Sequence, residues 1–212
     1  MNITYEAGYY LAQNFFDTLF PGDVRGLHHI PREGGFLLAA NHASFFDPPA
    51  IGCRLPRKIH YLARKTLFKK GLIGKILETV QAIPIDRDGD SDIGAMKKVI
   101  AALRSGEGVI LFPEGTRTPD GSIQEAKSGL GMIACRGGVP VVPTRIFGSF
   151  DAYSRRAKRP SLFTPIEVTF GKPLPPTEFD PGGPSKKRYQ EATNRIMERI
   201  KSLPPPNPSP YL

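Results

Sequence analysis

The chain has 212 residues, of which 40% are hydrophobic, and its 29 basic and 20 acidic residues give a net charge of +9. This length and composition predict one α/β domain with a sizeable core, and the charge indicates an anionic partner: a phosphate ligand, a lipid surface or nucleic acid. No apolar stretch approaches the roughly 20 residues of a membrane span, and no basic segment followed by an apolar run indicates a signal peptide.

Residues 4–20 have the spacing of an amphipathic helix with a wide apolar surface. Tyr9 and Phe16 share one face at helical spacing, while Leu11 and Phe15, four residues apart, form a second apolar row. Such a helix packs onto a domain or lies in a membrane interface, and the sequence leaves both interpretations open. The segment contains no Lys or Arg, which argues against electrostatic anchoring by this helix alone.

The apolar run at 36–40 predicts a short buried strand that leads into the segment 41–47. Pro48 and Pro49 cannot continue this strand, so the chain must turn, and strand ends are where α/β folds place their chemistry. The turn brings Asp47 back to His42, and an imidazole held by a carboxylate is a general base for a hydroxyl. Taken alone, the stretch is equally typical of a helix start with Asp47 as N-cap and a structural His42.

Residues 54–75 hold eight Lys and Arg residues and no acidic residue. We expect a short helix at 50–55 and a strand at 58–63, followed by a segment in which apolar residues from Leu67 to Leu77 alternate with cations. A basic amphipathic helix of this kind is typical of contact with a membrane surface. The alternative is an ordinary solvated face over a stripe that packs on the core.

Two predicted strands end in arginine-containing segments. The strand at 82–85 precedes Arg87, and the strand at 109–112 runs into the segment 113–117, which includes Gly115 and Arg117. A glycine permits close backbone approach, exposed N–H groups favour an anion, and arginine adds a bidentate donor. Each arginine could equally form a surface ion pair with a neighbouring carboxylate.

The rest of the chain continues the α/β pattern. Lys127 lies near the start of a predicted helix, and the last residues are rich in proline. The predicted elements here are a helix at 124–136, a strand at 139–147, a strand at 166–170, and a helix at 186–203.

The sequence Asn41-His42-Ala43-Ser44-Phe45-Phe46-Asp47 resembles the N-H-x-x-x-x-D signature of the glycerolipid acyltransferases that make phosphatidic acid. Three further blocks resemble the same family in the same order, at residues 83–87, 112–117 and 139–143. The second of these reads Phe-Pro-Glu-Gly-Thr-Arg, and its combination with the first signature is highly specific. The resemblance covers about residues 35–150.

The resemblance implies a single α/β domain with a central, mostly parallel sheet flanked by helices. We expect an N-terminal amphipathic helix at 1–22 and the catalytic domain at 23–203. The proline-rich tail at 204–212 is expected to be disordered.

The resemblance also implies an acyltransferase that moves a fatty acyl group from acyl-coenzyme A or acyl carrier protein to the free hydroxyl of 1-acyl-sn-glycerol 3-phosphate. His42 is then the general base, Asp47 orients and stabilises the imidazolium, and neither an acyl-enzyme nor a metal or other cofactor is expected. The two thiols, Cys53 and Cys135, are expected to be reduced and without a base. The implied substrate-binding residues are Arg87, Glu114, Gly115, Thr116, Arg117, Lys65 and Lys127, and the implied supporting residues are Asn41 and Ser44.

An acceptor of this kind keeps its chain in the bilayer, so we expect peripheral contact with an anionic membrane surface at the cytoplasmic face. Glycerol 3-phosphate, another lysophospholipid or a lyso-ornithine lipid are alternative acceptors. A non-catalytic basic module that binds lipid or nucleic acid also explains the charge of +9. That alternative does not explain the combination of His42, Glu114 and Arg117, and no nucleic-acid motif supports it.

Overall fold

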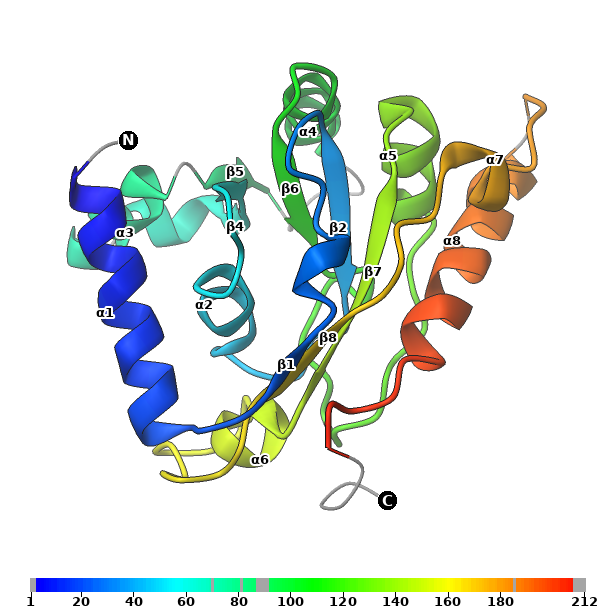
Figure 1. Ribbon diagram of the computed structural model, residues 1–212. Coiled ribbons are helices and arrows are strands. Elements are labelled where there is room, and N and C mark those ends of the chain that lie inside the picture. Colours follow the sequence, from blue (N-terminus) through cyan, green and yellow to red (C-terminus); the bar gives the residue numbers. More distant parts are fainter. Residues whose placement is uncertain (1–2, 70, 81, 87–91, 185, 208–212) are drawn as a thin grey trace.

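The structure is a computed structural model that describes residues 3–69, 71–80, 82–86, 92–184 and 186–207 (Figure 1). Strands and helices alternate along most of the chain, as the sequence predicts. The strands are β1 (Val24–Arg25), β2 (Phe36–Ala40), β3 (Ile59–His60), β4 (Leu62–Arg64), β5 (Ile83–Ile85), β6 (Gly108–Leu111), β7 (Val141–Phe147) and β8 (Glu167–Phe170). The α-helices are α1 (Ile3–Leu19), α2 (Asp47–Gly52), α3 (Gly71–Thr79), α4 (Ile93–Arg104), α5 (Gly129–Gly137), α6 (Ser149–Tyr153), α7 (Pro176–Phe179) and α8 (Lys186–Lys201), with 3₁₀ turns η1 (Leu27–His29) and η2 (Lys65–Lys69).

Within the described residues, six strands form one sheet in the order β1-β8-β7-β2-β6-β3. β2 is central, because Leu38 pairs in parallel with Ile110 of β6 on one side and with Val142 of β7 on the other. The pair β7 and β8 is antiparallel, and β4 and β5 pair in parallel as a separate small sheet. The expected mostly parallel sheet is therefore confirmed, and the carboxyl ends of β2, β6 and β7 meet at one edge.

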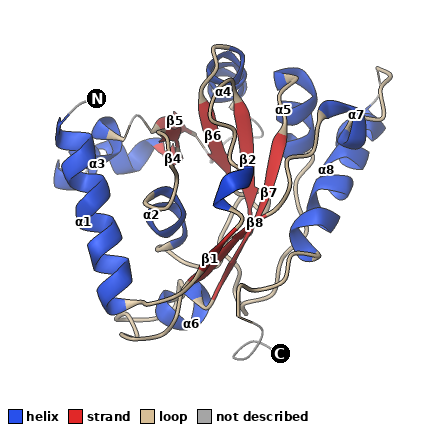
Figure 2. Ribbon diagram, viewed as in Figure 1, coloured by secondary structure: helices blue, strands red, loops and turns tan. Residues whose placement is uncertain are grey.

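Helices cover both faces of this sheet (Figure 2). Leu38 and its same-side neighbours on β2 belong to a core that also contains Phe16 and Phe20 of α1 and Ile51 of α2. Leu37 faces a second core, which contains residues of α4, α5 and α8. Because successive strand residues face opposite sides, burial on both faces explains why β2 is apolar at every position.

Several predicted elements differ from the observed ones. The predicted strand at 58–63 is two short strands in different sheets, separated at Tyr61, whose carbonyl accepts a hydrogen bond from the N–H of Ile83 at 2.6 Å. The predicted helix at 124–136 begins only at Gly129, because residues 118–124 form a loop of side-chain hydrogen bonds around Asp120. The brief helices α6 and α7 were not predicted, since four or five residues carry too little periodicity.

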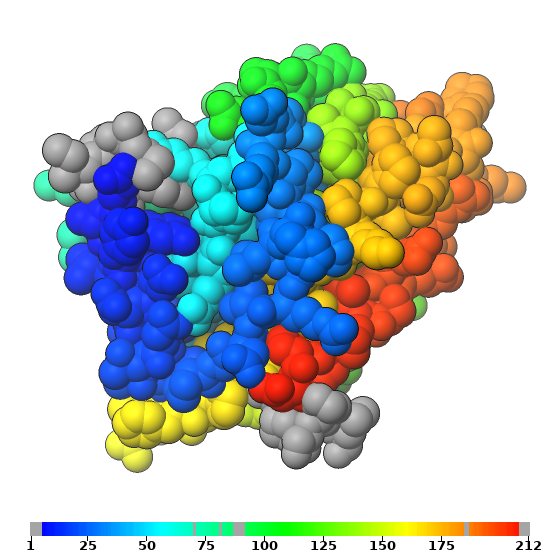
Figure 3. All heavy atoms as spheres, in the orientation of Figure 1, coloured from blue at the N-terminus to red at the C-terminus, as the bar shows by residue number. Residues whose placement is uncertain are grey.

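The N-terminal helix is confirmed as α1, and its apolar surface is only partly covered by the domain. Phe16 is buried against the domain, whereas Tyr10, Leu11 and Phe15 on the other side are exposed. Figure 3 shows α1, in dark blue, along one flank of the molecule. In the described part of the chain, no helix is long and apolar enough to cross a membrane.

The described part of the predicted tail, residues 204–207, lies against the sheet. The carbonyl of Pro204 accepts a hydrogen bond from Thr169 Oγ1 at 2.8 Å, and Asn207 Nδ2 donates to Glu167 Oε1 at 3.2 Å. Residues 208–212, the remainder of the predicted tail, lie outside the described residues.

Candidate active site

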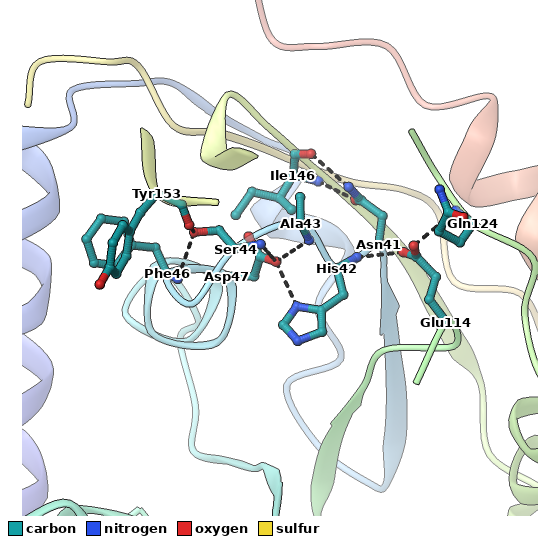
Figure 4. A network of polar contacts seen from close by, with 10 residues as sticks. All are labelled: Asn41, His42, Ala43, Ser44, Phe46, Asp47, Glu114, Gln124, Ile146 and Tyr153. Carbon is teal, nitrogen blue, oxygen red and sulfur yellow. Dashed lines mark hydrogen bonds and ion pairs between the residues drawn. The ribbon is translucent and has the colours of Figure 1, made fainter. Parts of the chain in front are cut away.

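The segment that follows β2 folds into a tight loop that joins His42 to Asp47 (Figure 4). The distance between His42 Nδ1 and Asp47 Oδ2 is 2.8 Å. Asp47 is also the first residue of α2, with Pro48 and Pro49 following it in the first turn. The predicted helix start is therefore observed, but the N-cap is Phe46 and not Asp47, whose carboxylate binds the preceding loop instead. When Nδ1 carries the imidazole proton, it donates a hydrogen bond to the carboxylate, and Nε2 keeps its lone pair for a substrate hydroxyl.

Asp47 is fully buried, and its Oδ2 atom organises the loop. The same oxygen accepts hydrogen bonds from the backbone N–H groups of Ala43 at 2.6 Å and Ser44 at 2.7 Å. Its Oδ1 atom has no hydrogen-bond partner among the residues that the structure describes. The carboxylate therefore holds the loop and the imidazole through one oxygen atom.

The other face of the imidazole is fixed by an aromatic ring. His42 stacks on Phe112, the first residue after β6, with ring centroids 4.2 Å apart and planes inclined by 24°. Stacking and the bond to Asp47 together restrict the imidazole to one orientation, and the His42 side chain keeps 11% of its surface exposed. A positioned but accessible ring is what general-base catalysis requires.

Glu114 links the loop that follows β2 to the loop that follows β6. Its Oε1 accepts the backbone N–H of His42 at 2.7 Å, and its Oε2 accepts that of Gln124 at 3.0 Å. The N–H of Thr118 in turn donates to the carbonyl of His42 at 2.9 Å. Glu114 is only 4% exposed, and burial raises the pKa of its carboxyl group, while the Gln124 and His42 amides counteract the rise.

Asn41 and Ser44 connect the loop that follows β2 to strand β7 and to helix α6. The Asn41 side chain exchanges two hydrogen bonds with the backbone of Ile146 in β7, at 3.1 and 2.8 Å. Ser44 Oγ donates to the carbonyl of Tyr153 at 2.6 Å and accepts the N–H of Phe46 at 3.0 Å. The Ser44 hydroxyl is therefore engaged in holding the backbone, and the residue is fully buried.

The turn after β6 places a cation beside the catalytic loop. The guanidinium carbon of Arg117 lies 3.3 Å from the centroid of the Phe45 ring. Gly115 has a φ of +70°, a conformation that favours glycine, and a Cβ atom there would lie 3.4 Å from Lys127 Cε. The Lys127 side chain therefore passes close to this turn. Thr116, which lies between Gly115 and Arg117 in the sequence, is exposed.

Two further cations were predicted for the site, Lys65 and Arg87. Lys65 is exposed at the first position of η2. The pKa of Asp92, the N-cap of α4, is lowered mainly by the amides of Asp86 and Ala95, and the charge of Lys65 contributes to this effect. Arg87 lies outside the described residues.

Both thiols are poor nucleophiles. Burial raises the pKa of Cys53 to about 11, and burial likewise raises that of Cys135 to about 11. Both groups are therefore protonated at neutral pH, and the thiolate is the reactive form. Over the ranges that the structure describes, no three His, Cys, Asp or Glu side chains are grouped closely enough to hold a metal ion.

Sequence reasoning missed the aromatic partners of the site. Phe112 supports His42 and Phe45 supports Arg117. Phe45 was visible as an apolar residue in a predicted turn, whereas Phe112 was taken as the end of the predicted strand at 109–112. The role of Gln124 was not visible at all, because only its backbone N–H takes part. The assembled site offers a positioned base, a buried carboxylate behind it, and nearby cations for an anionic substrate.

Comparison with known proteins agrees with this chemistry. The family model described as Acyltransferase matches residues 22–147, which include both the His42 loop and the Glu114 turn. A 1-acyl-sn-glycerol-3-phosphate acyltransferase of Bacillus subtilis (strain 168) is 34% identical over 183 residues, which cover 85% of this chain and 86% of that protein. A chloroplastic 1-acyl-sn-glycerol-3-phosphate acyltransferase of Brassica napus is 30% identical over 180 residues, which cover 84% of this chain and 50% of that protein.

A solved structure shares the fold. The crystal structure of the 1-acyl-sn-glycerophosphate (LPA) acyltransferase PlsC from Thermotoga maritima aligns with a TM-score of 0.72 and 26% sequence identity. The alignment covers 94% of this chain and 79% of that chain.

Proposed function

Since the chain belongs to the acyltransferase family, we propose that it transfers a fatty acyl group to the free hydroxyl of 1-acyl-sn-glycerol 3-phosphate, giving phosphatidic acid for phospholipid biosynthesis. The observation that carries this proposal is the His42–Asp47 pair, whose imidazole is oriented for proton abstraction. Relatives with this activity in their names, at 30% and 34% identity, support the choice of acceptor.

In the proposed mechanism, His42 Nε2 removes the proton from the acceptor hydroxyl as its oxygen attacks the thioester carbonyl. The tetrahedral intermediate collapses, the carbon–sulfur bond breaks, and the imidazolium returns its proton to the departing thiolate. The Asp47 carboxylate stabilises the imidazolium while it exists. Direct transfer agrees with the elevated pKa values of Cys53 and Cys135, which disfavour an acyl-cysteine.

The acceptor phosphate is proposed to bind near Arg117, whose guanidinium stacks on Phe45 in the catalytic loop. Lys127 beside Gly115 adds a second cation, and Arg87 and Lys65 are assigned to the same phosphate from the family resemblance. Glu114 is assigned to the acceptor site as a positioning residue, because both of its carboxylate oxygens already accept backbone amides. The family resemblance also assigns Thr116 to this site.

The acyl donor is a thioester of coenzyme A or of acyl carrier protein. Thiol release from each thioester, measured with and without 1-acyl-sn-glycerol 3-phosphate, tests the proposed reaction. We expect release that depends on this acceptor, and mass spectrometry of the lipid product should show phosphatidic acid. If thiol release depends only on glycerol 3-phosphate or on a lyso-ornithine lipid, that compound replaces 1-acyl-sn-glycerol 3-phosphate as the assigned acceptor. The absence of release with any of these compounds would refute the proposal.

We also propose peripheral contact with an anionic membrane at the cytoplasmic face. On α3, Leu72, Ile73 and Ile76 are exposed, and Lys69 and Lys75 lie at or beside the same helix. Apolar residues that lie beside cations suit the boundary between head groups and acyl chains. The Lys69→Glu, Lys75→Glu variant should sediment less with anionic vesicles at low salt, and unchanged sedimentation would exclude α3 from the contact.

A further inference from the structure

The loop that joins α6 to β8, residues 154–166, is the second strongly basic and apolar surface of the molecule. Arg155, Arg156, Lys158 and Arg159 occur within five residues, and residues 152–166 include no acidic side chain. All four cations are exposed. They are followed by Leu162 and Phe163, which are 51% and 67% exposed. We refer to residues 154–166 as the α6–β8 loop.

The α6–β8 loop is held in place by backbone hydrogen bonds. The N–H of Ser161 donates to the carbonyl of Ala152 at 2.8 Å, and the N–H of Phe163 donates to the carbonyl of Leu19, at the end of α1, at 2.7 Å. Among the described residues, Phe163 is the only non-glycine residue with a positive φ, at +63°. Such a conformation is strained in a bulky residue, and this kind of strain occurs preferentially at functional sites.

The attachment to Leu19 makes the α6–β8 loop continuous with the exposed side of α1. Leu11 and Phe15 lie four residues apart on that side, and both are exposed. Figures 1 and 3 show the loop, in yellow, beneath the end of α1 that Leu19 occupies. Helix α1 carries no Lys or Arg. Its exposed apolar row therefore ends beside the α6–β8 loop, which supplies four cations.

The loop is also joined directly to the active site. Ser154 forms an isolated antiparallel bridge with Ser44, and Ser44 Oγ donates to the carbonyl of Tyr153. Arg155 Nη1 lies 3.5 Å from the carbonyl oxygen of Arg117, the residue proposed to bind phosphate. A body that contacts the α6–β8 loop therefore lies next to the catalytic loop.

We propose that the α6–β8 loop binds an anionic lipid bilayer, with its cations at the head-group phosphates and Phe163 and Leu162 inserted among the acyl chains. The partner fits in charge, since the segment carries four cations and no acid, and in polarity, since its apolar residues adjoin those of α1. The inference rests on the proposed function, because a lipid acceptor reaches His42 from the bilayer only if the catalytic loop adjoins it. The α6–β8 loop and the adjoining end of α1 thus form a proposed contact in addition to the one on α3.

A charge-matched pair of variants tests the proposal. In the loop variant, Arg156, Lys158 and Arg159 are each changed to Gln, and Arg155 is kept because it contacts Arg117. In the control variant, the exposed residues Lys97 and Lys98 of α4 and Lys187 of α8 are changed to Gln, so the net charge is the same. Binding is measured by co-sedimentation with vesicles that contain phosphatidylglycerol, at low and high salt.

We expect the loop variant to bind these vesicles on the order of 10²-fold more weakly than the control variant at low salt, and we expect the difference to shrink as salt is added. Equal binding by the two variants would overturn the proposal. Unchanged vesicle binding together with lost use of acyl carrier protein as donor would also overturn it, since the loop would then dock an acidic protein.

Phe163→Gly separates insertion from folding. Glycine adopts a φ of +63° without strain, so the variant should unfold at a urea concentration no lower than that of wild type. Its salt-resistant vesicle binding should fall roughly tenfold because an exposed aromatic ring is lost. Wild-type binding by folded Phe163→Gly would contradict insertion of this residue.

Turnover of a water-soluble, short-chain acceptor separates the two proposals. The loop variant and Phe163→Gly should both retain wild-type turnover of this acceptor. If wild type itself does not acylate it, the proposed function fails, whereas the vesicle comparison still decides the role of the α6–β8 loop. If the loop variant loses turnover of the soluble acceptor as well, its cations act on the acceptor and not on the bilayer, and the proposal is overturned.

Discussion

Replacing Asp47 by Asn separates the charge of this residue from its role in holding the loop. Asp47 Oδ2 accepts hydrogen bonds from His42 Nδ1 and from the N–H groups of Ala43 and Ser44. An amide oxygen in the same position keeps all three bonds. The amide nitrogen then takes the position of Oδ1, which is buried without a described partner, and an unsatisfied donor there costs about 1–3 kcal/mol of stability.

The effect on catalysis should be larger than the effect on folding. With charge centres about 4 Å apart and an effective dielectric constant of about 20, the carboxylate stabilises the imidazolium by about 4 kcal/mol. Loss of that charge should therefore lower kcat about 10³-fold. The assay is acceptor-dependent thiol release, and urea unfolding reports the stability of the same sample.

The matched variant is Asp47→Ala, which removes the hydrogen-bond-accepting oxygen atoms entirely. It leaves the amides of Ala43 and Ser44 without their carboxylate oxygen, so we expect it to lose roughly 2–6 kcal/mol of stability in addition to its activity. A folded Asp47→Asn protein that keeps more than a tenth of wild-type kcat would refute the charge argument. Equal instability of the Asn and Ala variants would refute the hydrogen-bond argument.

Three further predictions concern residues around the pair. Arg117→Ala should raise the KM for the phosphorylated acceptor, and Arg117→Lys should restore the wild-type KM only poorly because the planar guanidinium is lost. An unchanged acceptor KM in both variants would exclude a phosphate contact. A protein with Cys53→Ser and Cys135→Ser should retain its kcat in the thiol-release assay, and a folded but inactive double variant would point to a covalent acyl-cysteine instead. Glu114→Gln turns an NH₂ group toward one of two buried amide donors, so urea unfolding should show a loss of about 1–3 kcal/mol, accompanied by lower kcat; wild-type stability would contradict the linking role.

The parts of the fold that the sequence predicted well are those that depend on local pattern. The continuous apolar run of β2 predicted a short buried strand, and Pro48 and Pro49 predicted the turn that returns Asp47 to His42. The family resemblance, carried by four sequence blocks, is confirmed by the family model and by the relatives. Motif and periodicity were sufficient here because the residues involved are close in sequence.

The parts that the sequence did not predict depend on distant contacts. Helix α5 begins at Gly129 and not at 124, because residues 118–124 form a loop held by side-chain hydrogen bonds around Asp120 and by the bond from the Gln124 N–H to Glu114. Glu114 was expected to touch the substrate, and its burial with both oxygens occupied appears only when the β2 and β6 loops are placed side by side. The stacking of Arg117 on Phe45 likewise joins residues that are 72 positions apart and carry no shared sequence pattern.

The most direct test of the proposed mechanism is the turnover of His42→Ala. Thiol release in the presence of 1-acyl-sn-glycerol 3-phosphate should fall to nearly the rate without enzyme, because the two carboxylates that adjoin His42, those of Asp47 and Glu114, are engaged by backbone amides. Urea unfolding and circular dichroism of the same sample should show a folded protein, since the Ala43, Ser44 and Glu114 backbone contacts do not involve the imidazole. Substantial acceptor-dependent thiol release by folded His42→Ala would contradict the assignment of His42 as the general base.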